Sequence, residues 1–209
     1  MAKLLPPFLA GTEPWPELLR QLQLYLDLLL RWNTRVNLTA VREPEQIVTR
    51  HFGESLLAAQ VLARHLESQA AQLTRLADLG SGAGFPGIPI KLLMPGIELV
   101  LIESQNKKAT FLREVVRTLH LKNVQVFCGR AEQWHGSADA VTLRAVEQFT
   151  SVLPVAAGLV RDHGLLCLLI GADQIEAAHQ LIRGKWRWSE PISVPGSTAR
   201  KIVLAQRAR

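Results

Sequence analysis

The sequence has little cysteine and no long apolar run. Its 209 residues include two cysteines, Cys128 and Cys167, which are far apart and belong to neither a C-x-x-C motif nor a Cys/His cluster. This spacing excludes a disulfide framework and the usual zinc-ligand patterns, so we expect two reduced thiols in the core and no metal site. No stretch of about 18 consecutive apolar residues is present to span a membrane, and the apolar part of the N-terminus is too short for a signal peptide. We therefore expect a cytoplasmic protein that does not contact a membrane.

The charge of the chain is biased toward basic residues. Lysine and arginine number 24 against 18 aspartates and glutamates, which gives a net charge of +6. Such an excess favours a polyanionic partner, although many basic proteins bind no nucleic acid. With 48% hydrophobic and 20% charged residues, the composition is that of a globular chain. Its length suits one domain with a small extension.

The N-terminal third is predicted to be helical. Apolar residues recur every three or four positions between Trp15 and Trp32, as in an amphipathic helix. A second helical region covers about 44–66, and Gly53 is a candidate interruption within it. We expect the leucine-rich face of the first helix to pack against the rest of the chain. We assign residues 1–72 to an N-terminal helical extension.

From residue 73 onward, short apolar segments alternate with helical patterns. This alternation predicts an α/β fold over residues 73–209, with a mostly parallel, seven-stranded sheet and helices on both faces. The last two β-rich segments, joined through Pro195 to Ser197, are predicted to form an antiparallel hairpin at the sheet edge. The expected strands cover residues 73–79, 98–103, 124–128, 138–143, 165–170, 186–194 and 201–205, and the expected helices cover residues 86–94, 107–119, 149–161 and 172–183.

The most informative segment follows the first of these strands. Asp78 closes an apolar run, and Gly80, Gly82 and Gly84 follow in a loop that ends where a helix is predicted to begin. Glycines let the chain turn sharply and bring bare backbone against a ligand. A nucleotide-like cofactor is the expected occupant, and an ordinary left-handed turn is the alternative.

Two cofactor classes use such a loop, and the spacing matches both. Gly80-x-Gly82-x-Gly84 fits a methyl-donor pattern, while Gly82-x-Gly84-x-x-Gly87 fits the dinucleotide fingerprint. Asp78 separates them, because a carboxylate there would repel the pyrophosphate of a dinucleotide. S-adenosylmethionine instead carries an ammonium and a sulfonium, which a carboxylate attracts directly or through water. The sequence therefore favours S-adenosylmethionine over NAD.

Further candidate site residues lie at the ends of the following strands. Glu103 closes the second strand about 20 residues after the glycine loop, where a carboxylate is expected to accept hydrogen bonds from the ribose hydroxyls. Ala131 and Glu132 follow the third strand and suit an adenine pocket. Arg144 ends the fourth strand, where it would hold the cofactor carboxylate or an RNA phosphate. The plainer alternatives are a solvated carboxylate, a surface charge and a structural salt bridge.

Basic residues supply candidate contacts to RNA. His51, after Arg50 in a helical stretch, is a candidate substrate contact, with a packing histidine as the alternative. Basic side chains provide most of the sequence-independent affinity for RNA, although such runs are more often solvated faces. The candidate substrate residues are Arg42, Arg50, His51, Arg200 and Lys201, and further basic residues cluster at Arg31, Arg35, Lys107, Lys108, Arg113, Arg117 and Lys122.

Three motifs carry a resemblance to a known family. They are Trp32-Asn33 with Val36 to Arg42, Arg50-His51 with Ser55, and Asp78 to Ile90. From about Leu18 to Leu204, the chain resembles the bacterial small-subunit ribosomal RNA guanine-N7 methyltransferases, also called the glucose-inhibited division protein B family. The segment from Phe85 to Pro89 is far more specific to this family than the glycines alone.

The resemblance implies an S-adenosylmethionine-dependent enzyme on a Rossmann-like class I methyltransferase fold. Its expected substrate is a guanine in the decoding-region loop of the small-subunit RNA, as free RNA or in the 30S particle, and we expect a monomer. No convincing catalytic base is present, so Arg144 and His51 are candidates for positioning. By position, the resemblance implies cofactor contacts at Gly80, Phe85, Ala131, Glu132 and Arg144, and a basic pair at Arg200 and Lys201.

Two other functions remain as alternatives at this point. An NAD-dependent oxidoreductase would use the same glycines, but it lacks a hydride-relay residue and must tolerate Asp78. A non-enzymatic RNA-binding assembly protein would not need the intact loop and Glu103.

The chain departs from the family pattern at a few positions. Glu54 stands where the family usually has Asp, and an unusual Gly53 precedes it. Leu143 replaces a small polar residue, and Ile170 stands where a lysine is common. The change at Ile170 removes a charge near the expected substrate cleft.

Overall fold

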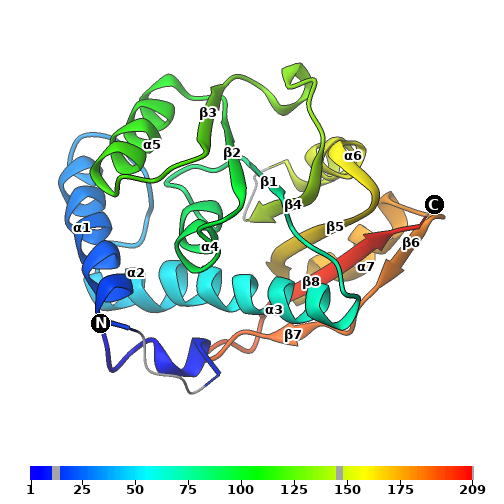
Figure 1. The fold of residues 1–209 in the computed structure, drawn as a ribbon, viewed down its shortest axis with the longest axis horizontal. Helices are drawn as coiled ribbons and strands as arrows, with labels where there is room; N and C mark the ends of the chain where they lie inside the picture. The colour runs from blue at the N-terminus through cyan, green and yellow to red at the C-terminus, as the bar shows by residue number, and fades with distance from the viewer. Residues whose placement is uncertain (11–14, 145–147, 209) are drawn as a thin grey trace.

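One mixed sheet forms the centre of the molecule, and the computed structural model describes residues 1–10, 15–144 and 148–208 (Figure 1). The strand order is β3-β2-β1-β4-β5-β8-β6, and β7 pairs with β8. Strands β3 to β5 of this order run parallel, while β6, β7 and β8 pair antiparallel. The strands are β1 (Arg75–Leu79), β2 (Glu98–Glu103), β3 (Val124–Cys128), β4 (Ala138–Arg144), β5 (Val160–Gly171), β6 (Trp186–Trp188), β7 (Ile192–Ser193) and β8 (Arg200–Arg207). The predicted mostly parallel α/β sheet is confirmed, but the part of the chain that the structure describes forms an eight-stranded sheet, not the predicted seven-stranded one.

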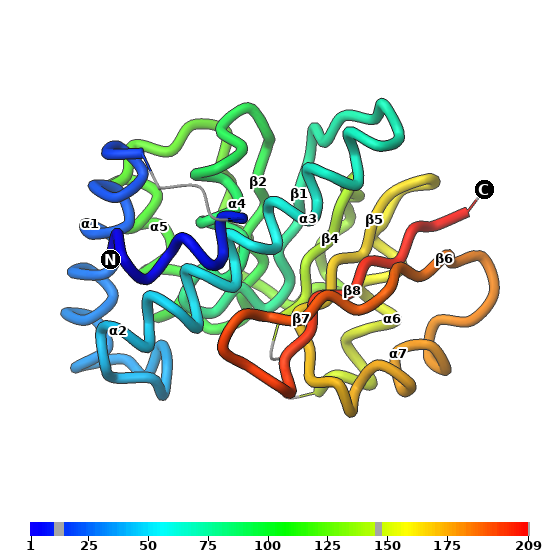
Figure 2. Tube along the Cα trace, turned by 90° about the horizontal axis from the view of Figure 1, so that it is seen from below, coloured from blue at the N-terminus to red at the C-terminus, as the bar shows by residue number. Residues whose placement is uncertain are grey.

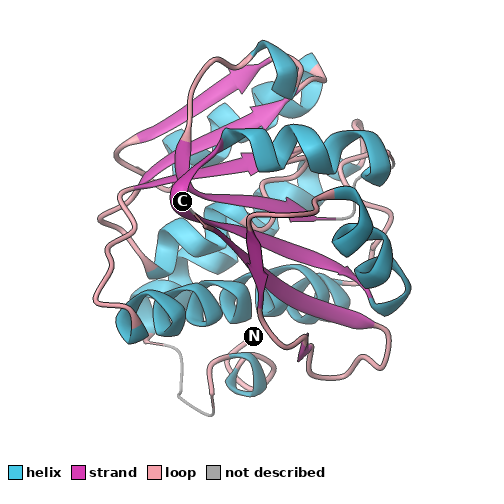
Figure 3. Ribbon diagram, turned by 90° about the vertical axis from the view of Figure 1, so that its right-hand side faces the viewer, coloured by secondary structure: helices cyan, strands magenta, loops and turns pink. Residues whose placement is uncertain are grey.

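Helices cover both faces of the sheet (Figure 3). Along β2, Leu99 and Leu101 join one apolar cluster and Val100 and Ile102 join the other, because successive side chains of a strand point to opposite faces. The first cluster also contains α1 (Pro16–Asn33), α3 (Glu54–Ser68), α4 (Gly87–Leu93) and α5 (Asn106–Thr118), and the second contains α6 (Phe149–Leu159) and α7 (Ile175–Leu181). This double burial explains why the parallel strands read as continuous apolar runs.

The N-terminal helices share the apolar core of the first face. Helix α1 lies beside α5 (Figure 1), where Trp32 Nε1 donates a hydrogen bond of 2.8 Å to Glu114. The short α2 (Pro44–Ile47) continues through a π-helical turn, Val48–Gly53, into α3. The predicted helical region is therefore confirmed, and Gly53 ends its π-helical turn. Such turns are often found at functional sites. The division into residues 1–72 and 73–209 stays a prediction.

The structure corrects the C-terminal strands. Strand β8 lies between β5 and β6, not at the sheet edge, and the segment 186–194 splits into β6 and β7. Residues 202–205 of β8 are apolar and buried, which suits an interior strand. Strand β5 begins at Val160, so α6 ends two residues before the predicted boundary at Arg161. The exposed polar residues 161–163 hid this part of the strand, in which Val160 pairs with Ala138 of β4 before the register shifts.

The two thiols differ in their surroundings. Both cysteines are free. Cys167 is fully buried, as predicted, and burial raises the pKa of its thiol to about 12. Cys128 is only half-buried at the end of β3, so its prediction as a core residue is wrong. Within the described part of the chain, no helix is both long enough and apolar enough to cross a membrane.

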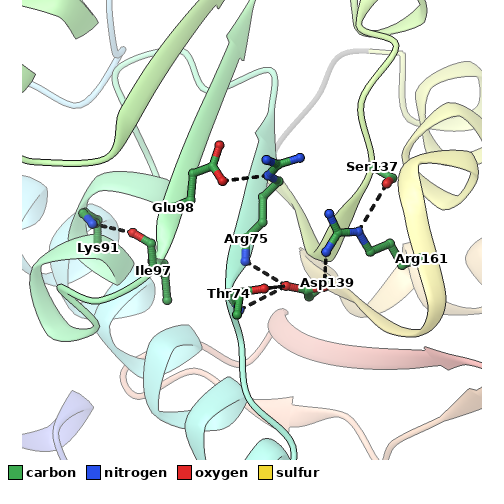
Figure 4. Close-up of polar contacts among 8 residues, drawn as sticks. All are labelled: Thr74, Arg75, Lys91, Ile97, Glu98, Ser137, Asp139 and Arg161. Carbon is green, nitrogen blue, oxygen red and sulfur yellow. Dashed lines mark hydrogen bonds and ion pairs between the residues drawn. The ribbon is translucent and has the colours of Figure 1, made fainter.

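Asp139 joins three neighbouring strands at their amino ends (Figure 4). Its carboxylate accepts hydrogen bonds from the backbone N–H groups of Thr74, at 3.0 Å, and Arg75, at 2.8 Å, and from the Thr74 hydroxyl. It also pairs with Arg161 of β5 at 2.7 Å. Burial raises the pKa of Asp139, but these hydrogen bonds outweigh burial and hold the pKa below its usual value. These contacts hold the amino ends of β1, β4 and β5 together, at the end of the strands opposite the glycine loop.

We expect Asp139→Asn to lower the free energy of unfolding at pH 7 by about 1–2 kcal/mol, because hydrogen bonds to a charged group are lost at a partly exposed site. A carboxylate with a lowered folded-state pKa stabilises above its unfolded pKa, so the difference from wild type should shrink as pH falls below about 4. Urea unfolding at pH 7 and pH 3.5 measures both effects. Glu98→Gln, which removes one exposed ion pair with Arg75, is the control; an equal loss in both variants would contradict the role of Asp139.

Candidate active site

A cavity opens at the carboxyl ends of β1, β2 and β3. Gly80, Ala131 and Glu132, which the sequence predicts as cofactor contacts, all line it. In open parallel sheets, ligands bind at this end, beside the point where the strand order reverses, here between β1 and β4. The remaining lining residues are Leu79, Ile102, Ser104, Gly129, Arg130, Gln148 and Val152. The structure therefore brings together residues from three successive strand ends.

The glycine loop has the left-handed backbone that its glycines allow. Gly80, Gly82 and Gly84 have φ values of 64°, 56° and 89°. A Cβ at Gly84 would collide with the Tyr25 hydroxyl and with Ile88, whereas a Cβ at Gly82 would meet nothing closer than the Gly80 carbonyl oxygen, at 3.7 Å. Gly84 is thus required for packing inside the protein. Gly82 leaves its outer side open to a ligand.

Asp78 lies beneath the loop and is fully buried. Its Oδ1 accepts a hydrogen bond of 2.7 Å from the Thr142 hydroxyl, and its Oδ2 accepts one of 3.2 Å from the Gly87 N–H. Burial raises the pKa of Asp78 to about 6, against the effect of these hydrogen bonds. The sequence interpretation had Asp78 attract the cofactor, but its buried carboxylate braces the loop. When ionised, it places a negative charge below the loop, and a closer contact with a cofactor stays a prediction.

Glu103 holds the loop from the other side. It is 5% exposed at the end of β2, and its two oxygens accept hydrogen bonds from the backbone N–H groups of Gly82, at 2.9 Å, and Gln105, at 2.7 Å. A carboxylate offers about four lone-pair positions, so acceptor capacity is left for ribose hydroxyls. The predicted position of Glu103 fits this role, and ribose binding stays a prediction.

An aromatic cluster supports the end of the loop. The ring of Phe85 stacks on Tyr25, with centroids 5.3 Å apart, and on His51, at 4.9 Å. The Tyr25 hydroxyl donates a hydrogen bond to the Ala83 carbonyl and so ties α1 to the loop. Sequence reasoning counted Tyr25 only as part of an apolar helix face. The hydroxyl of Tyr25, a polar group within an otherwise apolar helix face, was the signal in the sequence that could have identified this contact.

Arg144 and His51 are joined by a hydrogen bond that determines which ring nitrogen of the histidine carries the proton. Arg144 Nη2 lies 2.9 Å from His51 Nδ1, and a guanidinium can only donate, so Nδ1 accepts. Nε2 then carries the proton and donates to the Thr39 hydroxyl at 2.8 Å. Burial, together with the charge of Arg144, lowers the pKa of His51 to about 3. The ring is neutral at physiological pH, and Nδ1 is not free to accept another proton.

Glu54 connects two arginines from different strands. Its side chain is 3% exposed; Oε2 lies 3.3 Å from Arg144 Nη2 and Oε1 lies 2.6 Å from Arg200 Nε. Arg144 also donates to the Arg50 carbonyl at 2.7 Å. The sequence analysis treated Glu54 only as a departure from the family pattern. A carboxylate three residues after the predicted Arg50-His51 pair, about one helical turn away, was the signal that could have identified it.

The other predicted substrate residues lie farther from the cavity. Arg42 donates to the Asn33 carbonyl at 2.9 Å and so closes the loop after α1. Lys201 donates to Ser193 of β7 at 2.9 Å. Ile170 and Leu143 are 5% and 0% exposed within the second apolar cluster. Apolar residues therefore suit both of these positions.

Comparison with known proteins identifies relatives along nearly the whole chain. Residues 18–197 match the family model GidB, described as rRNA small subunit methyltransferase G. The ribosomal RNA small subunit methyltransferase G of Stenotrophomonas maltophilia is 41% identical over 193 residues, which cover 90% of this chain and 84% of that protein.

Solved structures share the fold. TrmN from Thermus thermophilus has a TM-score of 0.58 and 15% identity, over 77% of this chain and 53% of that one. TYW2 from P. horikoshii, solved in complex with MeSAdo, has a TM-score of 0.52 and 14% identity, over 64% of this chain and 56% of that one. At this identity the likeness concerns the fold, and it confirms the predicted Rossmann-like architecture of methyltransferases.

We expect His51 to stay neutral far below the usual histidine range. In a pH titration followed by NMR, its ring signals should not move between about pH 8 and 4.5, whereas exposed histidines titrate near 6.5. The unfolded chain binds the proton that the folded chain refuses, so His51 should reduce stability as pH falls below about 6.5. A His51→Gln variant assigns the signals among the six histidines. An inflection for His51 above pH 5 would show that its Nδ1 is not held by Arg144.

Proposed function

The chain belongs to the GidB family, rRNA small subunit methyltransferase G, and from this premise we propose its reaction and the roles of its residues. It is a methyltransferase. We propose that it transfers a methyl group from S-adenosylmethionine to the N7 of a guanine in small-subunit 16S ribosomal RNA. The single observation that carries the proposal is the glycine loop, which is open at Gly82 and whose Gly80 lines the cavity at the strand ends.

The residues at the strand ends fit the proposed cofactor. The methionine part of the cofactor would lie against the loop at Gly80, Gly82 and Phe85. Glu103 would accept hydrogen bonds from the ribose hydroxyls. Ala131 and Glu132 line the same cavity and would contact the adenine. Arg144 would hold the carboxylate of the cofactor. MeSAdo in the structurally similar TYW2 supports an adenosine-type ligand on this fold.

The chemistry requires positioning more than proton transfer. Bound S-adenosylmethionine would supply an electrophilic methyl group on its sulfonium. Guanine N7 has an in-plane lone pair and no proton, so the protein needs to align it with the methyl group and need not remove a proton. Neutral His51, with Nδ1 occupied by Arg144, suits this role: it holds the guanidinium without serving as a base.

The proposed substrate must present its base outside a regular helix. In A-form RNA, N7 lies in a deep and narrow groove, so the target guanine belongs in a loop or in a partly assembled 30S particle. The basic residues Arg42, Arg50, Arg200 and Lys201 would contact the RNA backbone. We further propose that the protein acts as a monomer in the cytoplasm.

The two other functions are weaker. Family membership argues against an NAD-dependent oxidoreductase, and the glycine loop braced by Asp78 and Glu103 argues against a protein that only assists assembly.

Methyl transfer and nucleotide mapping test the proposal together. Purified protein, labelled S-adenosylmethionine and either 30S particles or 16S RNA should yield one methylated guanine, and cells without the protein should lack that mark. Calorimetry with S-adenosylmethionine and NAD in parallel should show binding only for the first. Binding of NAD alone, or methylation at a position other than N7, would overturn the proposal.

We expect Gly82→Val to raise the Kd for S-adenosylmethionine by at least about tenfold, because a branched side chain resists positive φ and occupies the open side of the loop. Circular dichroism should show an intact fold, since no protein atom lies closer than 3.7 Å to the added Cβ. Gly184→Val is the matched control, because Gly184, just before β6, also has a positive φ, 91°, and its Cβ would meet nothing within 4 Å. Unchanged affinity in a folded Gly82→Val protein would remove the loop from the site.

We expect the methylation rate to lack the fall below neutral pH that marks a general base. Between about pH 5.5 and 8.5, single-turnover rates at saturating cofactor and RNA should change no more than the ionisation of Asp78, with its pKa of about 6, accounts for, with folding checked at each pH. His51→Ala should weaken substrate binding or lower the rate without changing the shape of the profile, and the exposed His163→Ala is the control. A steep rise with pH that disappears in His51→Ala would show that a proton is removed, and N7 would no longer be the expected acceptor.

A further inference from the structure

A second cavity lies beside Arg50 and Arg200, outside the proposed cofactor site. Its walls come from the N-terminal segment, the π-helical turn and the turn before β8. Its volume is about 590 Å³. Ligand pockets commonly measure about 300–1,000 Å³, so a nucleotide unit would fit. Its lining residues are Lys3, Leu4, Pro7, Phe8, Thr49, Arg50, Pro195, Gly196 and Arg200.

Three cationic residues line this cavity, and no acidic residue does among those that the structure describes. Lys3 and Arg50 are exposed, so solvent screens their mutual repulsion. Arg200 is held by its ion pair with the buried carboxylate of Glu54. The three cations come from three separate parts of the chain, and together they favour an anionic ligand.

An unusual glycine allows the N-terminal segment to form one wall. Phe8, 4% exposed, packs over Gly53, where a Cβ would lie only 2.7 Å from the Phe8 ring. Leu5 and Leu9, 0% and 3% exposed, anchor the same segment. Figure 2 shows this N-terminal segment crossing the helical chain that leads into α3. The family match covers residues 18–197, so this wall lies outside it.

Two residues of the cavity, Arg50 and Arg200, are linked to Arg144 at the proposed methyl-transfer site. Arg50 lines the cavity with its side chain, and its carbonyl accepts the hydrogen bond from Arg144. Glu54 likewise binds Arg200 at the cavity and Arg144 at the strand end. A ligand that contacts Arg50 or Arg200 would therefore be one residue removed from Arg144, whose guanidinium lies 6.0 Å from the centre of the Phe85 ring.

We propose that this cavity binds a backbone phosphate of the ribosomal RNA strand that flanks the target guanine, with Lys3 as one of the contacts. The inference rests on the proposed function, because it takes the substrate to be RNA. Three cations at one cavity match a phosphodiester, and phosphate contacts fix the register of a strand without reading its sequence. The docked N-terminal segment thus serves as part of the substrate site.

The salt dependence of RNA binding measures the predicted contact. Lys3→Gln should weaken binding of 16S ribosomal RNA about threefold and reduce the slope of log K against log salt by about 0.7, the value for one phosphate contact with a single strand. Lys185→Gln, an exposed lysine just before β6, is the matched control and should change neither quantity. The Kd for S-adenosylmethionine should be the same in all three proteins.

A second variant tests the docking of the wall. Phe8→Ala removes the anchor over Gly53 and should lower RNA affinity as Lys3→Gln does, with an intact fold by circular dichroism. The double variant should lose little more than either single variant, because both changes remove one contact.

The outcomes separate this inference from the proposed function. If the wild type binds S-adenosylmethionine and methylates RNA but Lys3→Gln matches Lys185→Gln, the phosphate site is wrong and the function stands. If the wild type neither binds nor methylates ribosomal RNA, both fall. Equal weakening of cofactor and RNA binding by Lys3→Gln would indicate a general loss of structure and would also overturn the phosphate site.

Discussion

The buried carboxylate of Glu54 pairs with the guanidinium groups of both Arg144 and Arg200, and these two ion pairs join the end of β4 to the cationic cavity beside the N-terminal segment. One anion faces two cations in a setting where little water screens them. Removing it would leave two partly buried cations without compensation, which is more costly than losing an exposed pair. The three residues come from α3, β4 and β8, so this contact also fixes the C-terminal strands against the N-terminal helices.

The glycine loop is also held by buried carboxylates, because two of them accept hydrogen bonds from its backbone. Asp78 binds the N–H of Gly87, and Glu103 binds the N–H of Gly82. Neither contact needs a ligand, so the loop has its shape before a cofactor arrives. Such preorganisation reduces the entropy lost on binding and fits a reaction in which alignment supplies most of the catalysis.

The histidine beside the loop illustrates how packing decides chemistry. A histidine in solution changes charge near neutral pH, but burial and the charge of Arg144 keep His51 neutral. Its two ring nitrogens are both engaged, one by Arg144 and one by Thr39. The ring therefore contributes a surface for Phe85 and an acceptor for an arginine. The proposed reaction, in which the lone pair of the substrate base attacks the methyl group, requires no base from it.

The sequence alone determined the parallel core of the fold and predicted which strand ends carry the candidate site residues. Short apolar runs ending in Asp78, Glu103 and Arg144 are local patterns, and in a parallel sheet the ends of such runs meet at one edge. Only the tertiary structure decided what those side chains contact. Asp78 lies under the loop because Thr142, on the neighbouring strand, offers its hydroxyl there; Glu54 gains its role from Arg200, nearly 150 residues later. Strand β8 became interior because β6 adds to its far side. Such pairings depend on distances in space between residues far apart in the chain, which no local pattern encodes.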